Sequence, residues 1–194
     1  MGMIYTEIEQ YKIWLKNNLT EERYLHSLGT AEVAKELALR FNLDVKKAEL
    51  AGLIHDCAKC LDKDALLDLM KNCKTLSEEE LNNIKTYHAP AGEVLAQKEF
   101  GIVDEEILSA IRWHTIGKIG MSDFDKIIFI ADKIETKTRP QEWVFPIREA
   151  LNIGLDNAML CCFSNTIKSL VDRKLYICTS TIDIYNDILA KISK

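Results

Sequence analysis

Helical periodicity runs through most of this 194-residue chain, and no segment alternates polar and apolar residues for long enough to predict a strand. The chain has three prolines and eight glycines, and most of the glycines lie between periodic segments or at their ends. Helices are predicted over residues 20–41, 44–55, 77–90, where Pro90 interrupts the segment, 104–117 and 122–135. More helices and one connecting loop are expected before a last helix from about Thr181. The sequence therefore predicts an all-α fold.

Length and charge restrict the class of protein. A chain of 194 residues is most simply one domain, and a net charge of −5 argues against binding to nucleic acid, which needs a basic surface. The longest apolar runs, such as residues 127–131, are far too short to cross a bilayer. The N-terminus lacks the basic and then apolar order of a signal peptide. These features predict a cytoplasmic protein with neither a nucleic-acid nor a membrane partner.

Six cysteines fit a reducing compartment as free thiols. Cys57 and Cys60 form a Cys-x-x-Cys pair, but there is no second pair and no strand of the kind that precedes a redox motif. We therefore expect these two sulfurs to have no catalytic role.

All four histidines lie on or beside the apolar face of a predicted helix, where an imidazole without a partner would be costly. Two aspartates accompany them, one directly after a histidine and one on a later helix. The six residues are His26, His55, Asp56, His88, His114 and Asp132. A single inward histidine is more often a hydrogen-bonded core residue. Six such groups together predict a metal site between helices, because imidazole and carboxylate hold iron, manganese, cobalt, nickel or zinc.

The order of these residues resembles the HD-domain phosphohydrolase superfamily, whose pattern is a lone histidine, a His-Asp pair and a distal aspartate. Longer motifs are similar to one branch, the YqeK family of symmetrical diadenosine tetraphosphate hydrolases. These motifs are Arg23-Tyr24-Leu25-His26, the segment 51–59 (AGLIHDCAK), His88-Ala89-Pro90, His114-Thr115-Ile116-Gly117 and the segment 131–135 (ADKIE). The resemblance implies a single domain of residues 1–194: an HD-domain helical bundle with a metal-binding core at about 20–135 and additional C-terminal helices over 136–194.

The resemblance also implies a ligand set. His26, His55, Asp56 and Asp132 would hold the principal ion, which is expected to be iron, with manganese, cobalt, nickel or zinc as alternatives. His88 and His114 would either ligate a second ion bridged by Asp56 or contact substrate phosphate, so the site would be mononuclear or dinuclear.

Further roles follow from the same resemblance. Asp56, Lys59, His88 and His114 are the expected catalytic residues. The expected substrate contacts are Arg23, His26, His88, His114, Thr115, Asp132 and Arg139. The segment 174–179 would contact adenine and ribose. For Lys59 and Arg23 the ordinary alternatives are a solvated lysine at a helix end and an ion pair with a carboxylate.

Two departures from the family pattern fall near the expected site. Ile116 replaces a threonine, and residues 136–139 (TKTR) contain a one-residue insertion before the arginine. Arg139 is therefore an uncertain equivalent of the family's arginine, and Lys137 is its rival.

The implied reaction is metal-dependent hydrolysis of diadenosine tetraphosphate to two ADP, with a metal-activated water attacking an inner phosphorus. One alternative is an HD-family nucleotidase that acts on nucleoside mono- or diphosphates. Another is a nucleotide-sensing module without turnover. The substrate would be a small nucleotide, and the sequence leaves a homodimer open.

Overall fold

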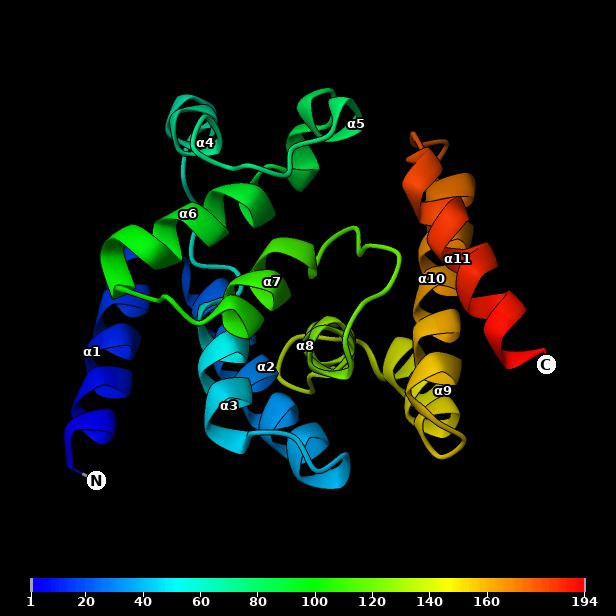
Figure 1. Ribbon diagram of the computed structural model, residues 1–194, viewed down its shortest axis with the longest axis horizontal. Coiled ribbons are helices and arrows are strands. Elements are labelled where there is room, and N and C mark those ends of the chain that lie inside the picture. The colour runs from blue at the N-terminus through cyan, green and yellow to red at the C-terminus, as the bar shows by residue number, and fades with distance from the viewer. Residues whose placement is uncertain (1, 194) are drawn as a thin grey trace.

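The computed structural model describes residues 2–193, which fold into eleven α-helices and one short 3₁₀ helix, with no strand among them (Figure 1). The all-α prediction is confirmed. The helices are α1 (Gly2–Asn18), α2 (Glu21–Arg40), α3 (Val45–Ile54), α4 (Lys63–Met70), α5 (Glu78–Leu81), the 3₁₀ helix η1 (Ile84–Thr86), α6 (His88–Phe100), α7 (Glu105–Trp113), α8 (Asp123–Ile134), α9 (Gln141–Leu151), α10 (Leu155–Asp172) and α11 (Thr179–Ile192).

Side-chain caps fix the starts of the helices that carry the site. Thr20 accepts a hydrogen bond from the backbone of Arg23 at the start of α2, and Asp44 accepts from the first turn of α3. Ser122 and Asp125 form a reciprocal capping box at the start of α8. Because α2 packs against both α3 and α8, these capped ends set the register of three helices that meet around one interior.

The segment before His88 differs from the prediction. The capping box of Ser77 and Glu80 is present, but it opens only the four-residue helix α5. A new helix, α6, begins at His88, so Pro90 lies in its first turn instead of interrupting a helix. Proline is tolerated there because the first amides of a helix have no partner within the helix. The predicted interruption is therefore wrong.

The C-terminal helices α9, α10 and α11 stand together on one side of the molecule, next to α8 (Figure 1). Phe129 of α8 stacks on Phe163 of α10, with ring centroids 5.2 Å apart. At the far end of α10, the carboxylate of Glu79 accepts hydrogen bonds from the backbone amides of Thr179 and Ser180, at 2.7 and 3.3 Å. Glu79 thereby caps the start of α11, where a negative charge is favourable, and ties the segment 174–179 to α5.

A buried ion pair fixes α5 to α7. Arg112 is 1% exposed, and its guanidinium donates to both carboxylate oxygens of Glu80 at 2.7 Å. The same guanidinium donates to the side chain and the carbonyl of Thr75 and lies over the ring of Trp113. Since His114 comes two residues after Arg112, this pair also holds the end of α7 that carries His114.

The hydrophobic core contains buried side chains from Leu15 of α1 to Ile188 of α11. Within residues 2–193, no helix is both long and apolar enough to cross a membrane. The assignment of the whole chain to a single domain stays a prediction.

Candidate metal centre

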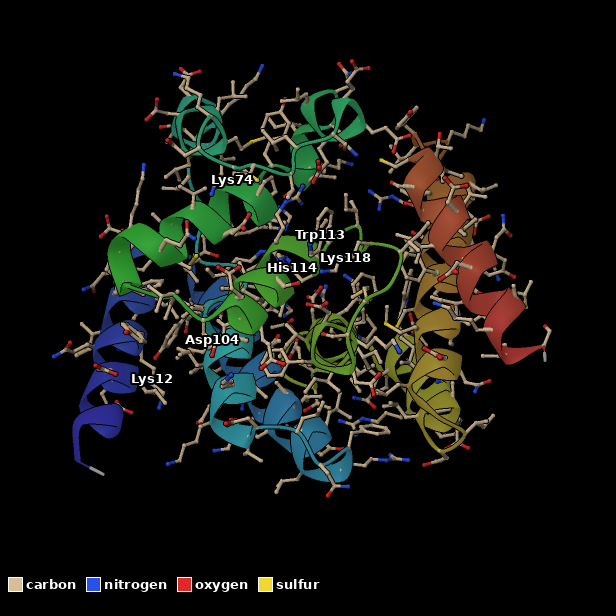
Figure 2. All side chains as sticks on the ribbon, in the orientation of Figure 1. Lys12, Lys74, Asp104, Trp113, His114 and Lys118 are labelled. Atoms are coloured by element: carbon tan, nitrogen blue, oxygen red, sulfur yellow. The ribbon has the colours of Figure 1, made fainter. Side chains whose placement is uncertain are left out.

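The six inward residues of the sequence pattern meet in one buried cluster. All four histidines are at most 5% exposed, and the two aspartates at most 4%. His26 comes from α2, His55 and Asp56 from the end of α3, His88 from the start of α6, His114 from the end of α7 and Asp132 from α8. Figure 2 shows His114 beside Trp113 at the end of α7, in the middle of the view. The structure therefore brings together every residue that the sequence proposed as a metal ligand.

His55 and His114 are oriented by the same local geometry. Each is the last, capping residue of its helix, and each ring Nδ1 lies 2.7 Å from the carbonyl oxygen three residues earlier, at Gly52 or Ile111. Nδ1 must carry the proton in such a contact, because a carbonyl oxygen can only accept. Nε2 of both rings is then the unprotonated nitrogen and faces the cluster, which is the form in which histidine binds a metal. Nε2 of His55 has no hydrogen-bond partner, whereas Nε2 of His114 lies 3.0 Å from the hydroxyl of Thr115.

Asp56 stands between two sets of histidines. Its Oδ2 lies 3.9 Å from Nε2 of His26 and 3.8 Å from Nε2 of His55. Its Oδ1 lies 3.4 Å from Nε2 of His88 and 3.3 Å from Nε2 of His114. Both sets, His26–His55–Asp56 and Asp56–His88–His114, are close enough to hold a metal ion. One carboxylate is thus available to both.

Asp132 completes the first set and binds two cations. Its Oδ1 lies 2.9 Å from Nε2 of His26, and its two oxygens accept from Arg139 and from Lys133, both at 2.6 Å. Arg139 also donates from Nε to the carbonyl of Asp132. Lys137, the rival of Arg139 after the insertion, instead pairs with Glu32 on α2 at 3.0 Å.

Glu135 is a site residue to which the sequence reasoning gave no role. It is fully buried, and its Oε1 lies 3.1 Å from Nδ1 of His26. Thr138 holds the same carboxylate through its amide and hydroxyl, and the amide of Lys137 donates to it at 2.7 Å. Gly29 gives it room, since a Cβ there would lie about 3.2 Å from the carboxyl carbon of Glu135. Glu135 therefore orients the ring of His26, as carboxylates behind metal-binding histidines commonly do. In the sequence, the feature that could have identified Glu135 as a site residue is its position at the end of the ADKIE motif.

The remaining predicted residues line one side of the cluster. Lys59 Nζ lies 2.9 Å from Nε2 of His88, and the hydroxyl of Thr115 lies 3.0 Å from Nε2 of both His88 and His114. Arg23 is less tightly held, with 3.5 Å from its guanidinium to Asp56 Oδ2 and about a third of its side chain exposed. Ile116, at the family's threonine position, is buried.

Burial and neighbouring charges shift the pKa values of the ionisable groups in opposite directions. Complete burial lowers the pKa of His55 to about 3, and burial also lowers the pKa of His88 well below its usual range. Burial alone would raise the pKa of Asp56, but the histidines and Lys59 around it outweigh burial and hold its pKa well below the ordinary value. Neutral His55 and His88 therefore lie beside an ionised carboxylate, as metal binding requires. His26 differs, because its hydrogen bonds to Asp132 and Glu135 outweigh burial and raise its pKa.

Two buried atoms test whether a metal fits these residues. Within residues 2–193, Nε2 of His55 and Oδ1 of Asp56 are buried and have no hydrogen-bond partner. Such groups are costly unless something else satisfies them, and both face the cluster. The donors present, imidazole nitrogen and carboxylate oxygen, suit a divalent metal ion.

The two sulfurs of the Cys-x-x-Cys pair do not join the site. Cys57 is buried, and its thiol contacts the carbonyl of Gly92 at 3.7 Å, whereas Cys60 is exposed. All six cysteines are free.

The fold and this cluster define an HD-type protein, and comparison with known proteins bears this out. The model of the HD domain family matches residues 23–137, so the chain belongs to the HD domain family. It is 37% identical over 172 residues to the symmetrical bis(5'-nucleosyl)-tetraphosphatase of Bacillus subtilis, covering 89% of this chain and 92% of that protein. It is 36% identical over 182 residues to the protein of that name from Staphylococcus aureus, covering 92% and 93%.

A solved structure supports the same family assignment. An HD superfamily hydrolase from Clostridium acetobutylicum, described as involved in NAD metabolism, aligns with a TM-score of 0.88 and 39% identity over 95% of this chain and 97% of that one. The resemblance to the HD superfamily and to its YqeK-type branch is therefore confirmed.

Proposed function

We propose that this protein hydrolyses diadenosine tetraphosphate symmetrically, to two molecules of ADP, in a metal-dependent reaction. The observation that carries the proposal is the position of Asp56, which offers one oxygen to His26 and His55 and the other to His88 and His114. The names of the Bacillus and Staphylococcus relatives, which align over most of their length, supply the substrate class.

The resident cofactor is a divalent metal ion, held by His26, His55, Asp56 and Asp132. Iron is the proposed metal, and manganese, cobalt, nickel and zinc are accepted by the same donors. When bound, such an ion supplies Lewis-acid chemistry and lowers the pKa of a coordinated water.

The side chains beside the ligands bind the polyphosphate. Lys59, Arg23 and Arg139 are cations at the rim of the cluster, each within 3.7 Å of a carboxylate oxygen of Asp56 or Asp132. They can neutralise the charge that develops on the phosphoryl oxygens during attack. The hydroxyl of Thr115 can donate to the same oxygens.

His88 and His114 have two candidate roles, since their Nε2 atoms can bind a second ion or face the substrate's phosphates. The leaving group is ADP, whose terminal phosphate departs readily without strong acid help. A proton from Lys59 or either histidine would still assist its departure.

One adenosine half of the substrate lies against the segment 174–179, as the family resemblance implies. The cap that Glu79 forms on Thr179 and Ser180 supports this role, because it fixes the start of α11 and with it the backbone of the segment. The free state of all six cysteines supports an enzyme of the cytoplasm.

The decisive experiment combines metal analysis of anaerobically purified protein with chromatography of reaction products. Diadenosine tetraphosphate, NAD, AMP and ADP serve as substrates, and Asp56→Ala is the inactive control. The proposal predicts ADP as the sole product of the dinucleotide. Inorganic phosphate and nucleoside from AMP or ADP would support the nucleotidase instead, and tight binding without turnover in iron-replete protein would support the sensor.

A further inference from the structure

A cavity outside the ligand cluster is lined by residues that have no role so far. It has a volume of about 360 Å³ and lies between the end of α8, the start of α9 and the C-terminal half of α10. Lys133 and Arg139 line its inner end, and Trp143, Asn165, Ser169 and Arg173 line the rest. The volume lies within the range of small-molecule sites, roughly 300–1,000 Å³.

The inner end of this cavity adjoins the candidate metal centre. Lys133 and Arg139 are the two cations that donate to the carboxylate of Asp132, each at 2.6 Å. An anionic ligand in the cavity would therefore lie against the two cations that contact Asp132. Three cations and no carboxylate line the cavity, in a chain whose net charge is −5, so the lining selects an anion.

The outer end suits a nucleoside. A second, more open hollow of about 380 Å³ shares Trp143, Asn165, Ser169 and Arg173 with the cavity and adds the carboxylates of Glu142 and Asp172. Trp143 is 42% exposed, so its ring is available for stacking on a base. Carboxylates and amides can accept from ribose hydroxyls and from an exocyclic amine. The lining thus changes from cationic side chains near the metal centre to an aromatic ring and charges of both signs farther out. This order matches a nucleotide that binds with its phosphates toward the metal centre and its base outward.

We propose that this cavity is the binding site for the second adenosine diphosphate half of the substrate, with Trp143 stacked on the base and the phosphates toward Lys133 and Arg139. The inference rests on the proposed function. Symmetrical cleavage divides the substrate at its central P–O–P bridge into two halves, each of which leaves as ADP. The segment 174–179 accounts for one of these halves, and the cavity beyond Lys133 and Arg139 accounts for the other.

The kinetic test compares two substrates with four phosphates each, diadenosine tetraphosphate and adenosine 5'-tetraphosphate, which lacks the second nucleoside. Trp143→Ala should raise KM for the dinucleotide about fivefold or more, the effect of one lost stacking contact, with kcat within about twofold. KM for adenosine 5'-tetraphosphate should stay within about twofold. Trp143→Phe, which keeps an aromatic ring, should restore most of the loss.

The matched control is Phe145→Ala, which removes an aromatic side chain from the same helix. Phe145 is 65% exposed and does not line the cavity, so its loss should change neither KM. An unchanged KM in Trp143→Ala, or an equal rise for both substrates, would overturn the proposal.

A binding measurement separates this proposal from the proposed function. ADP titrated into the metal-loaded protein should quench tryptophan fluorescence, and Trp143→Phe should lose the quenched component while keeping the emission of Trp14 and Trp113. If the wild type fails to hydrolyse the dinucleotide but shows this quenching, the proposed function fails and the subsite stands. If quenching is identical in Trp143→Phe, the subsite is wrong whatever the activity.

Discussion

The ion pair between Glu80 and Arg112 yields a stability prediction whose size follows from its burial. Both side chains are 1% exposed, and replacing Glu80 with leucine would leave the Arg112 guanidinium buried with only Thr75 as a hydrogen-bond partner. Removing one member of a buried ion pair typically lowers the free energy of unfolding by about 3–5 kcal/mol. For a chain of this length that corresponds to a fall in Tm of roughly 6–20 °C.

The double variant Glu80→Leu/Arg112→Met should be much less damaging than Glu80→Leu alone. Apolar residues of similar volume leave no charge at the two positions. The other polar groups that contact the pair belong to the exposed residues Thr75 and Ser77 and to Glu93, whose side chain is 23% exposed, so all three can bind water. We therefore expect the double variant to lose less than about 2 kcal/mol, so that a double-mutant cycle gives a coupling of about 2 kcal/mol or more.

Urea unfolding followed by circular dichroism, at one fixed metal concentration, measures these differences, since bound metal also stabilises the folded state. The exposed pair of Asp68 and Lys71 is the control, and Asp68→Leu should cost about 0.5 kcal/mol or less. The reasoning fails if Glu80→Leu is no worse than Asp68→Leu, or if the double variant loses the sum of the two single effects.

Three further predictions concern the metal centre. Asp56→Ala should abolish metal binding and hydrolysis, because both histidine sets share this carboxylate; full activity in a metal-replete variant would contradict the assignment. Glu135→Gln should weaken metal affinity about 10- to 100-fold while the protein stays folded, because the ring of His26 loses its carboxylate partner; competition with a chelator measures this, and an unchanged affinity would exclude the orienting role. Arg139→Ala should raise KM less than Arg23→Ala and should reduce metal content more, because Arg139 donates to Asp132 at 2.6 Å whereas Arg23 lies 3.5 Å from Asp56; a larger KM effect at Arg139 would show that it is the main phosphate contact.

The helices and the inward position of the histidines were predictable because their signals are local. A cap such as Asp44 or Ser122 lies next to the helix that it begins, and each histidine falls on an apolar face that can be read within one turn. Pro90 was misread because a proline looks the same in the first turn of a helix as at an interruption. Only the new helical start at His88 distinguishes them.

The residues that were missed depend on partners far away in the chain. Glu135 contacts a histidine 109 residues earlier, and Arg112 pairs with a carboxylate 32 residues earlier. The cavity at Trp143 is enclosed by α10, whose position no local pattern specifies. Such pairings follow from how the helices pack, so composition and periodicity cannot supply them.

The contacts of Lys59 bear on whether the centre holds one ion or two. The amine of Lys59 lies 2.9 Å from Nε2 of His88, and the hydroxyl of Thr115 lies 3.0 Å from the same atom. A lone pair that accepts from either group is not available to a metal. Nε2 of His55, by contrast, has no hydrogen-bond partner and faces the set that contains His26 and Asp132. The two sets therefore differ at their histidines: Nε2 of His55 has no partner, whereas Nε2 of His88 and of His114 lies beside donors of the kind that bind phosphate. Asp56 Oδ1, which faces the second set, has no partner and can serve either set. We infer that the ion of the first set is the resident one, and that the groups around His88 serve the substrate.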